Sequence, residues 1–422
     1  MLEHDRSQSL STQARPSTTV SRMQPQPDIQ RVATELLASK GLRLISCSSV
    51  QTLWAGYGHI CHLRASSDST GATKSLIFKY VSPPSSKKNK GGQLPDEGHI
   101  RKILSYQVEQ YFYTRLAPQM PKEIAVASCL ASVNTVAGGG DNTTGMIMDD
   151  LRDSFPVAGE KRAELNDTQV HAALQWLASF HGFWWSRDDE VRRVACISPP
   201  LEHFKQHKST ELGPQAGVWL NGGYTYLATR RKEYADLKLD EDSEWSSALC
   251  EPARSSEASI AELAAALLSS SAVRGHQTLI HGDVKSENLF TTTAGDAVAF
   301  FDLQYVGLGL GVCDLAKLFT CSVPRRMLVD SGDEVLSTAS KLEMQEGEET
   351  LLRQYHDQLQ RTSNRRYDWS MFVKHWQTAL VDWLRFQASW GFWGNSEWLE
   401  ARVRSILGDE EWLAWIKRAP AA

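Results

Sequence analysis

Three polar residues in the second half of the chain have the types and spacing that phosphoryl transfer requires. Asp283 and Asn288 have four residues between them, and Asp302 follows after an apolar run. A carboxylate can orient and deprotonate an attacking hydroxyl, while an amide and a second carboxylate can hold Mg²⁺ against phosphates. We therefore predict a phosphotransferase site that uses ATP and Mg²⁺. The alternative is a structural turn with buried, capped carboxylates.

The segments around these residues indicate how they would be positioned. Two apolar runs, 278–280 and 297–301, flank the polar stretch 281–288, and a polar turn lies at 291–296. Short apolar runs bounded by turn residues are typical of buried strands. We predict two short buried strands joined by a hairpin, with the polar groups placed where the strands end.

The motif resembles that of a known group of enzymes. His281-Gly282-Asp283, Asn288, the apolar run ending at Asp302 and the segment 311–316 (Gly-Val-Cys-Asp-Leu-Ala) are similar to the aminoglycoside phosphotransferase and choline kinase group, most of all to its ecdysteroid-kinase-like branch. The resemblance extends over roughly 44–398. It implies an α+β, two-lobed protein-kinase-like fold, with a small antiparallel-sheet lobe and a larger, mostly helical lobe.

The resemblance also implies what each polar residue does. Asp283 would accept the proton of the attacking hydroxyl, and Lys285 would neutralise the transferring phosphoryl group. Asn288 and Asp302 would bind Mg²⁺. The reaction would transfer the γ-phosphoryl group of ATP to a hydroxyl of a small molecule, with an amino alcohol, a sterol or a secondary metabolite as acceptor.

The first third of the chain supplies candidates for the ATP side. Gly56 and Gly58 lie between two predicted strands, where glycine lets backbone amides approach phosphates. Lys79 lies inside the apolar strand 75–81, an unusual place for a lysine unless it is paired. It would contact the α- and β-phosphates; the alternative is an edge-strand lysine that reaches water. The resemblance selects Glu109, on the following predicted helix, as its ion-pair partner.

The resemblance places the hinge between the two lobes at the end of the apolar strand 145–151. Backbone groups around Met148 and Asp150 would contact the adenine there. The predicted organisation is a disordered tail at 1–27, a nucleotide-binding lobe at 28–150 and a catalytic lobe with the acceptor pocket at 151–415.

Composition limits the remaining possibilities. The 422 residues are 41% hydrophobic with a net charge of −5, which suits a globular core and gives no sign of nucleic-acid binding. The seven cysteines are dispersed without metal-site spacing, as in proteins of a reducing compartment. The sequence shows neither a span-length apolar stretch nor the apolar core of a secretory signal. We predict a cytoplasmic protein without a membrane span.

Tryptophans dominate the C-terminal part of the chain. Four of them recur every seven residues from 369 to 390, a spacing that keeps them near one face of a helix. These tryptophans could belong to the hydrophobic core, or some of them could line an acceptor pocket for a flat, apolar or cationic molecule. Asp382 and Arg385 interrupt the stripe around Trp383, and charged residues beside buried aromatics need partners or a cavity.

Two other functions are compatible with a kinase-like scaffold. A protein kinase is one, but Gly282 stands where protein kinases have arginine, Asp-Leu-Gln at 302–304 replaces Asp-Phe-Gly, and no Ala-Pro-Glu follows. A non-catalytic binding module is the other. The presence of Asp283, Asn288 and Asp302 together argues against it.

Overall fold

An antiparallel sheet of five strands forms the small lobe of the protein. The computed structural model describes residues 27–83, 96–135, 143–207, 217–253, 256–269, 275–330 and 341–418. The predicted tail, up to residue 26, and most of the basic loop 82–98 lie outside these ranges. The sheet has the order β1-β2-β3-β5-β4 and consists of β1 (Leu42–Thr52), β2 (Gly58–Ser67), β3 (Thr73–Val81), β4 (Cys129–Thr135) and β5 (Thr143–Asp149).

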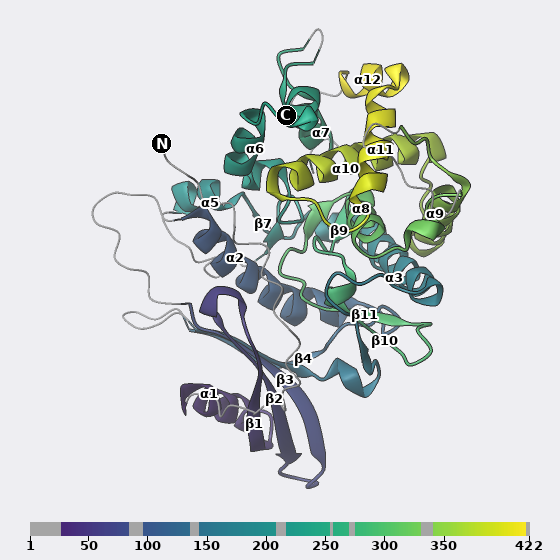
Figure 1. Cartoon of the computed structure of the whole chain (residues 1–422). Coiled ribbons are helices and arrows are strands. Elements are labelled where there is room, and N and C mark those ends of the chain that lie inside the picture. Colours follow the sequence, from purple (N-terminus) through teal and green to yellow (C-terminus); the bar gives the residue numbers. More distant parts are fainter. Residues whose placement is uncertain are drawn as a thin grey trace, which may run out of the picture.

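Two helices flank this sheet. Helix α1 (Pro27–Ala38) packs its apolar stripe, including Ile29 and Leu37, on the sheet residues Leu63 and Phe78. Helix α2 (Glu97–Tyr111) lies between the sheet and the helical lobe (Figure 1). The carboxylate of Asp96 caps its first turn by accepting from the backbone N–H of His99. Both helices were expected from their apolar periodicity.

Strand β3 occupies the centre of the sheet and carries Lys79. Its side chains alternate between the two faces: Phe78 packs in the cluster beneath α1, whereas Val81 packs with Ile103 of α2. Lys79 has the same parity as Val81, and it pairs in register with Ile60 on one side and Met146 on the other. The lysine therefore projects from a central strand toward α2, and it is not an edge-strand residue.

Most of the large lobe is helical, with two small sheets inserted (Figure 1). Its helices are α3 (Asp167–Ser186), α4 (Asp188–Val191), α5 (Pro200–His207), α6 (Arg231–Lys238), α7 (Ile260–Leu267), α8 (Val312–Cys321), α9 (Glu346–Ser363), α10 (Trp369–Trp390), α11 (Ser396–Leu407) and α12 (Glu410–Ile416). One sheet has the order β11-β10-β6, from Val298–Phe300, Leu289–Thr291 and Val157–Ala158. The other has the order β7-β8-β12-β9, from Cys196–Ile197, Val218–Trp219, Gly307–Gly309 and Thr278–Ile280.

The hairpin predicted around the polar stretch was assigned to the wrong pair of strands. Strand β11 pairs with β10, which begins directly after Asn288, whereas β9 pairs with β12 in the other sheet. The polar loop therefore crosses from one sheet to the next. Strand β4 begins only at Cys129, after residues 125–128, which have no regular structure. One reason is that the carbonyl of Ala125 accepts from the indole of Trp176 on α3.

A buried ion pair joins three helices of the large lobe. Glu348 of α9 binds Arg402 of α11 at 2.8 Å, and it accepts a hydrogen bond of 2.8 Å from the indole of Trp376 on α10. The three residues are at most 2% exposed. A buried carboxylate with these partners stabilises the helix arrangement only while all of its bonds are made. None of the helices within the described ranges is both long and apolar enough to cross a bilayer.

This cluster generates a stability prediction. Glu348→Gln should lower the free energy of unfolding by about 3 kcal/mol, because it leaves the Arg402 guanidinium buried without its counter-charge. The neighbouring Glu349 pairs with Arg353 on the surface, so Glu349→Gln should change stability by less than about 1 kcal/mol. Urea unfolding of both variants measures the difference. Equal losses in the two variants would contradict the role given to the buried pair.

Candidate active site

The backbone of the polar loop is held by one buried carboxylate. Asp314, in the first turn of α8, accepts from the backbone N–H groups of His281 at 2.7 Å and Gly282 at 2.9 Å. It also contacts Nε2 of His181 at 3.1 Å. Gly282 has φ +86°, and a Cβ there would lie 2.4 Å from the carbonyl oxygen of Tyr305. Glycine is therefore required at this position, and Asp314 fixes the loop that follows.

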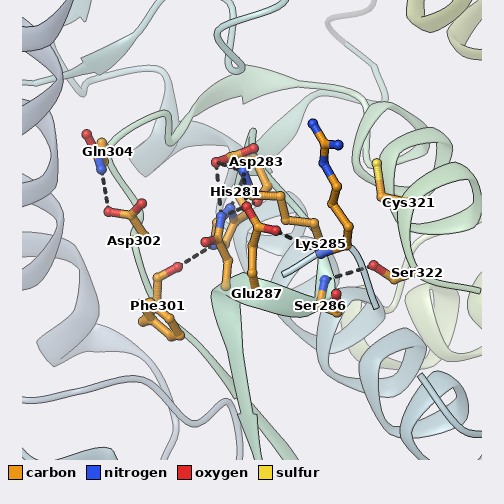
Figure 2. Close-up of polar contacts among 12 residues, drawn as sticks. His281, Asp283, Lys285, Ser286, Glu287, Phe301, Asp302, Gln304, Cys321 and Ser322 are labelled. Carbon is orange, nitrogen blue, oxygen red and sulfur yellow. Dashed lines mark hydrogen bonds and ion pairs between the residues drawn. The ribbon is translucent and has the colours of Figure 1, made fainter. Parts of the chain in front are cut away.

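His281 connects this loop to the segment that carries Asp302. Its Nδ1 accepts from the backbone N–H of Asp283 at 3.2 Å, so the proton is on Nε2, which donates to the carbonyl of Phe301 at 2.9 Å (Figure 2). The ring is fully buried. Because one neutral imidazole bonds both segments, it sets the position of Asp283 relative to Asp302. His181, whose Nε2 contacts Asp314, is also fully buried.

Asp283 lies at the centre of a compact polar group (Figure 2). The amide nitrogen of Asn288 donates to its carbonyl oxygen at 2.8 Å and to its carboxylate Oδ2 at 3.0 Å. Nζ of Lys285 lies 3.2 Å from the same Oδ2 and 3.2 Å from Oε1 of Glu287. Burial raises the pKa of Asp283 above its ordinary value of 3.8, and the cation of Lys285 opposes that rise.

The predicted ion pair between Lys79 and Glu109 is present, and it has a third member. Nζ of Lys79 lies 2.6 Å from Oε2 of Glu109 and 2.9 Å from Oδ1 of Asp302. Burial by itself would lower the pKa of Lys79, but the two carboxylates raise it well above 10.5. Burial raises the pKa of Glu109 to about 7, and the attraction of Lys79 limits that rise. For Asp302, Lys79 outweighs burial and keeps the pKa below 3.8.

The backbone and contacts of Asp302 leave one of its oxygens available. The residue has φ +62°, a conformation that non-glycine residues seldom adopt and that concentrates at functional sites. Lys79 and the side-chain amide of Gln304 both contact Oδ1, and Oδ2 has no bond to the described residues. The side chain of Asn288 likewise bonds the described residues only through its amide nitrogen, so its amide oxygen is available to a ligand.

These two oxygens have the chemistry that Mg²⁺ prefers. Hard oxygen ligands suit this ion, which in phosphoryl-transfer sites is held by one or two protein groups together with phosphates. Within the described part of the chain, no group of three or more His, Cys, Asp or Glu side chains could hold a metal ion. Asn288 and Asp302 would hold the ion jointly with a nucleotide.

The glycine loop predicted for the phosphates is a tight turn tied to α2. Gly56 has φ +73°, and a Cβ on Gly58 would lie 2.0 Å from the carbonyl oxygen of Tyr80. Between them, the hydroxyl of buried Tyr57 hydrogen-bonds to Nδ1 of His99. Close packing on β3 thus accounts for Gly58, while Gly56 supplies the turn. Sequence reasoning missed the tie between Tyr57 and His99.

Of the two residues expected at the hinge, Met148 lies within β5 and Asp150 follows the strand directly. Met148 pairs with Ile77 and Cys129 inside the sheet. The carboxylate of Asp150 bonds both Nε and Nη2 of Arg152, at 2.8 and 2.6 Å, and accepts from Ser75 at 2.9 Å. Because these bonds occupy the carboxylate, Asp150 could meet a nucleotide only through its backbone.

A cavity of about 180 Å³ opens on one side of Asp283. Neither Lys79 nor Asp302 lines it, and Figure 2 shows Asp302 on the opposite side of Asp283 from Cys321. The wall contains basic, acidic and aromatic side chains: Lys161, Arg162, Tyr224, Asp283, Val284, Lys285, Ser286, Glu287, Lys317, Cys321, Trp383, Trp390, Trp393 and Gly394. The position suits the molecule that would present its hydroxyl to Asp283.

The tryptophan stripe divides between core and cavity. Trp376 is fully buried core, whereas Trp383 and Trp390 line the cavity. Asp382, for which the sequence left open either a partner or a place at the cavity, is not part of the wall. Its carboxylate bonds the buried guanidinium of Arg385 at 2.8 Å. The carboxylate of the stripe is therefore already paired with its guanidinium.

The cavity also contains residues that sequence reasoning did not select. Lys317 lies one turn beyond Asp314 on α8. Tyr224 comes from the chain between α5 and α6. A lysine within the apolar segment of α8 was the one available signal, of the same kind that identified Lys79. Tyr224 had no such signal, because its position depends on how the chain between α5 and α6 packs.

The fold is the expected α+β, two-lobed kinase-like class: an antiparallel-sheet lobe and a helix-rich lobe, with the polar groups gathered between the sheet lobe and the catalytic loop. A sequence profile of the ecdysteroid kinase-like family matches residues 61–366. The match covers more than half of the chain, so the chain belongs to the ecdysteroid kinase-like family. No curated protein sequence matches it.

Solved structures are similar to the chain at low sequence identity. A choline kinase from Streptococcus pneumoniae has 12% identity and a TM-score of 0.39, over 92% of this chain and 99% of that chain. An aminoglycoside-3'-phosphotransferase of type VIII has 12% identity and a TM-score of 0.37, over 86% and 97%. An ethanolamine kinase from Plasmodium vivax has 11% identity and a TM-score of 0.34, over 89% and 84%.

The carboxylate of Asp314 generates a prediction that separates its role from that of a surface acid. Asp314→Asn should lower the free energy of unfolding by about 2–4 kcal/mol at neutral pH, because the donors that it satisfies are buried. Burial, the largest single influence, would raise the pKa of Asp314, but the hydrogen bond and charge interaction with His181, together with the charge of Lys317, lower it below 3.8. A depressed pKa means that this stability is present above pH 3.8 and is lost as the pH falls further.

Denaturant unfolding of wild type and variant between pH 3 and 7 measures both effects. Asp242→Asn, at an exposed position, is the matched control and should change stability by less than about 0.5 kcal/mol. A difference between wild type and Asp314→Asn that stays constant down to pH 3 would contradict the assignment.

Proposed function

We propose that this protein is an ATP- and Mg²⁺-dependent kinase that phosphorylates a hydroxyl of a small organic molecule. The observation that carries the proposal is the convergence of Asp283, Asn288, Asp302 and the pair Lys79–Glu109 beside a cavity whose wall includes Asp283. Each side chain has the chemistry that one part of phosphoryl transfer requires. Family membership supports the same function. Amino alcohols, sterols and other secondary metabolites are the acceptor classes considered.

Asp283 holds and deprotonates the attacking hydroxyl. Its carboxylate borders the cavity, and Asn288 and Lys285 orient it through Oδ2. The raised pKa brings this base closer to the pH at which it works, while Lys285 keeps it ionised near neutrality. Because Lys285 also lines the cavity, its ammonium group can offset the charge of the phosphoryl group in transit.

The nucleotide is placed by groups on the other side of Asp283. Lys79, positioned by Glu109, contacts the α- and β-phosphates, and the turn with Gly56 and Gly58 closes over them. Backbone groups at Met148 and Asp150 meet the adenine. Asn288 and Asp302 would hold Mg²⁺, which would neutralise phosphate charge when it is bound. The seven free cysteines accord with a reducing, cytoplasmic location.

A protein kinase is the second candidate, and no specific observation favours it. The segment from Asp302 to Asp314 is occupied by β12 and the beginning of α8, which leaves no long loop to bind a polypeptide. A non-catalytic module is disfavoured by the orientation of Asp283 and Asn288 toward each other. Incubation with generic protein substrates would test the first alternative directly.

Two substitutions separate base from metal ligand. Asp283→Asn should reduce kcat by about 10²–10⁴, the usual loss for a general base, and should leave ATP affinity nearly unchanged. Asp302→Ala should abolish turnover and most of the Mg²⁺ dependence of ATP binding. ATP titrations with and without Mg²⁺, together with single-turnover rates across a metabolite library, measure both. Full turnover in Asp302→Ala would end the metal assignment, and collapse of ATP binding in Asp283→Asn would make Asp283 a metal ligand or a structural residue.

The ion pair of Lys285 with Asp283 generates a pH prediction. Activity requires ionised Asp283, so the rate should fall as the pH decreases through the pKa of this group. In Lys285→Met, burial still raises that pKa and the opposing cation is gone. The acidic limb of kcat/KM should therefore shift to higher pH, whatever the loss in absolute rate. Lys122→Met, at an exposed position, is the control. An unmoved acidic limb in Lys285→Met would show that Asp283 is not the titrating base.

A further inference from the structure

We propose that Lys317 determines the specificity of the acceptor cavity, and that the acceptor is a non-cationic alcohol carrying a carboxylate or carbonyl oxygen that binds this ammonium group. The proposal rests on the kinase function argued above and narrows its acceptor. It assigns the oxygen-binding role to a residue that does not take part in the transfer step, and it excludes amino alcohols.

The first support is the incomplete bonding of Lys317. Its side chain lines the cavity, the residue is only 4% exposed, and Nζ donates to the carbonyl of Cys313, one helical turn earlier, at 3.1 Å. Among the described residues, no carboxylate lies within the 4 Å of an ion pair with it. An ammonium group has three donors, and leaving it buried without a counter-charge is unfavourable. An oxygen-bearing ligand would supply the missing partner.

A second donor on the same wall has the same requirement. Trp383 is 3% exposed, and its indole Nε1 is buried without a hydrogen-bond partner among the described residues. An indole N–H can only donate. Nζ of Lys317 lies 5.6 Å from the centre of the Trp383 ring. Two neighbouring groups that can only donate indicate a ligand with oxygen acceptors.

The charges around the cavity favour the same conclusion. Its wall carries four cationic side chains and two carboxylates. Both carboxylates, Asp283 and Glu287, are already paired with Lys285 at 3.2 Å, and Asp382 is paired with Arg385 outside the wall. An ammonium ligand would find no unpaired carboxylate, and it would be repelled by Lys317.

Aromatic rings could still bind a cation through their faces, but a cation of the protein already lies against three of the four lining rings. The guanidinium of Arg230 lies 5.4 Å from the ring centre of Tyr224 and 5.1 Å from that of Trp390, while Lys317 covers Trp383. The fourth lining ring, Trp393, packs edge-on against Trp383. The rings therefore offer a slot for a flat, apolar body and not an aromatic cage for an ammonium group.

Matched probes that differ only in charge test the proposal. Hydroxymethylbenzoate, its neutral amide and its trimethylammonium analogue are titrated by calorimetry into the full chain, and ATP affinity is measured separately with Mg²⁺. We expect the carboxylate to bind tightest and the ammonium weakest, with about tenfold or more between them. Lys317→Met should remove most of the advantage of the carboxylate over the amide, Lys317→Arg should keep it, and Lys317→Glu should reverse the order.

Lys232→Met is the matched control, because Lys232 is an exposed lysine on a helix outside the cavity, and it should keep the wild-type order. Binding of the ammonium probe by wild type as tightly as the carboxylate, or an unchanged order in both Lys317→Met and Lys317→Glu, would overturn the proposal. If Lys317→Met fails to fold, the order of probe affinities in the wild type and in Lys317→Arg still tests the proposal. Loss of the proposed function would instead appear as the absence of Mg²⁺-dependent ATP binding, with the charge preference intact.

Discussion

The buried ammonium group of Lys79 is the constraint on which the arrangement of the two lobes depends. A charge in the centre of a sheet is tolerated only when opposite charges surround it. Glu109 supplies one from α2, and Asp302 supplies the other from the large lobe. A single cation therefore fixes the sheet, α2 and the segment that carries Asp302 relative to one another. The same contacts bring the groups proposed for phosphate and metal into one place.

A second buried charge, the carboxylate of Asp314, fixes the position of the loop at 281–288. Asp314 binds two successive backbone N–H groups, and through His181 it is connected to the core of α3 and α9. His281 then transmits this position to Phe301, next to Asp302. The loop is thus positioned by a buried carboxylate and a buried imidazole, so the carboxylate of Asp283, the proposed base, is held in a fixed orientation. Such preorganisation is the main contribution a protein makes to phosphoryl transfer.

The cavity beside Asp283 is built differently from the polar loop, because its wall consists of helices that also form the core. Helix α10 contributes Trp376 to the interior and Trp383 to the cavity, and α8 contributes both Asp314 and Lys317. One turn of α8 thus separates Asp314, which fixes the loop, from Lys317, which we propose binds the acceptor. Aromatic rings near the cavity already interact with Arg230 and Lys317, so aromatic content alone is a poor guide to a cationic ligand.

The sequence by itself indicated the polar loop at 281–288, the lysine of β3 and the helices with clear apolar periodicity, because each depends on residue types and spacing within a few turns of chain. The two-lobed class followed from the resemblance to a known family. Local patterns did not decide which strands pair, so β9 was assigned to β11, although β11 pairs with β10 and β9 pairs with β12. They also could not show that Asp302, 223 positions from Lys79, completes its ion pair. Whether Asp382 faced a cavity or Arg385, and whether Lys317 lined one, depended on how α8 and α10 pack. Those choices are made by burial across the whole chain, where each charge must find a partner, and only the tertiary structure decides them.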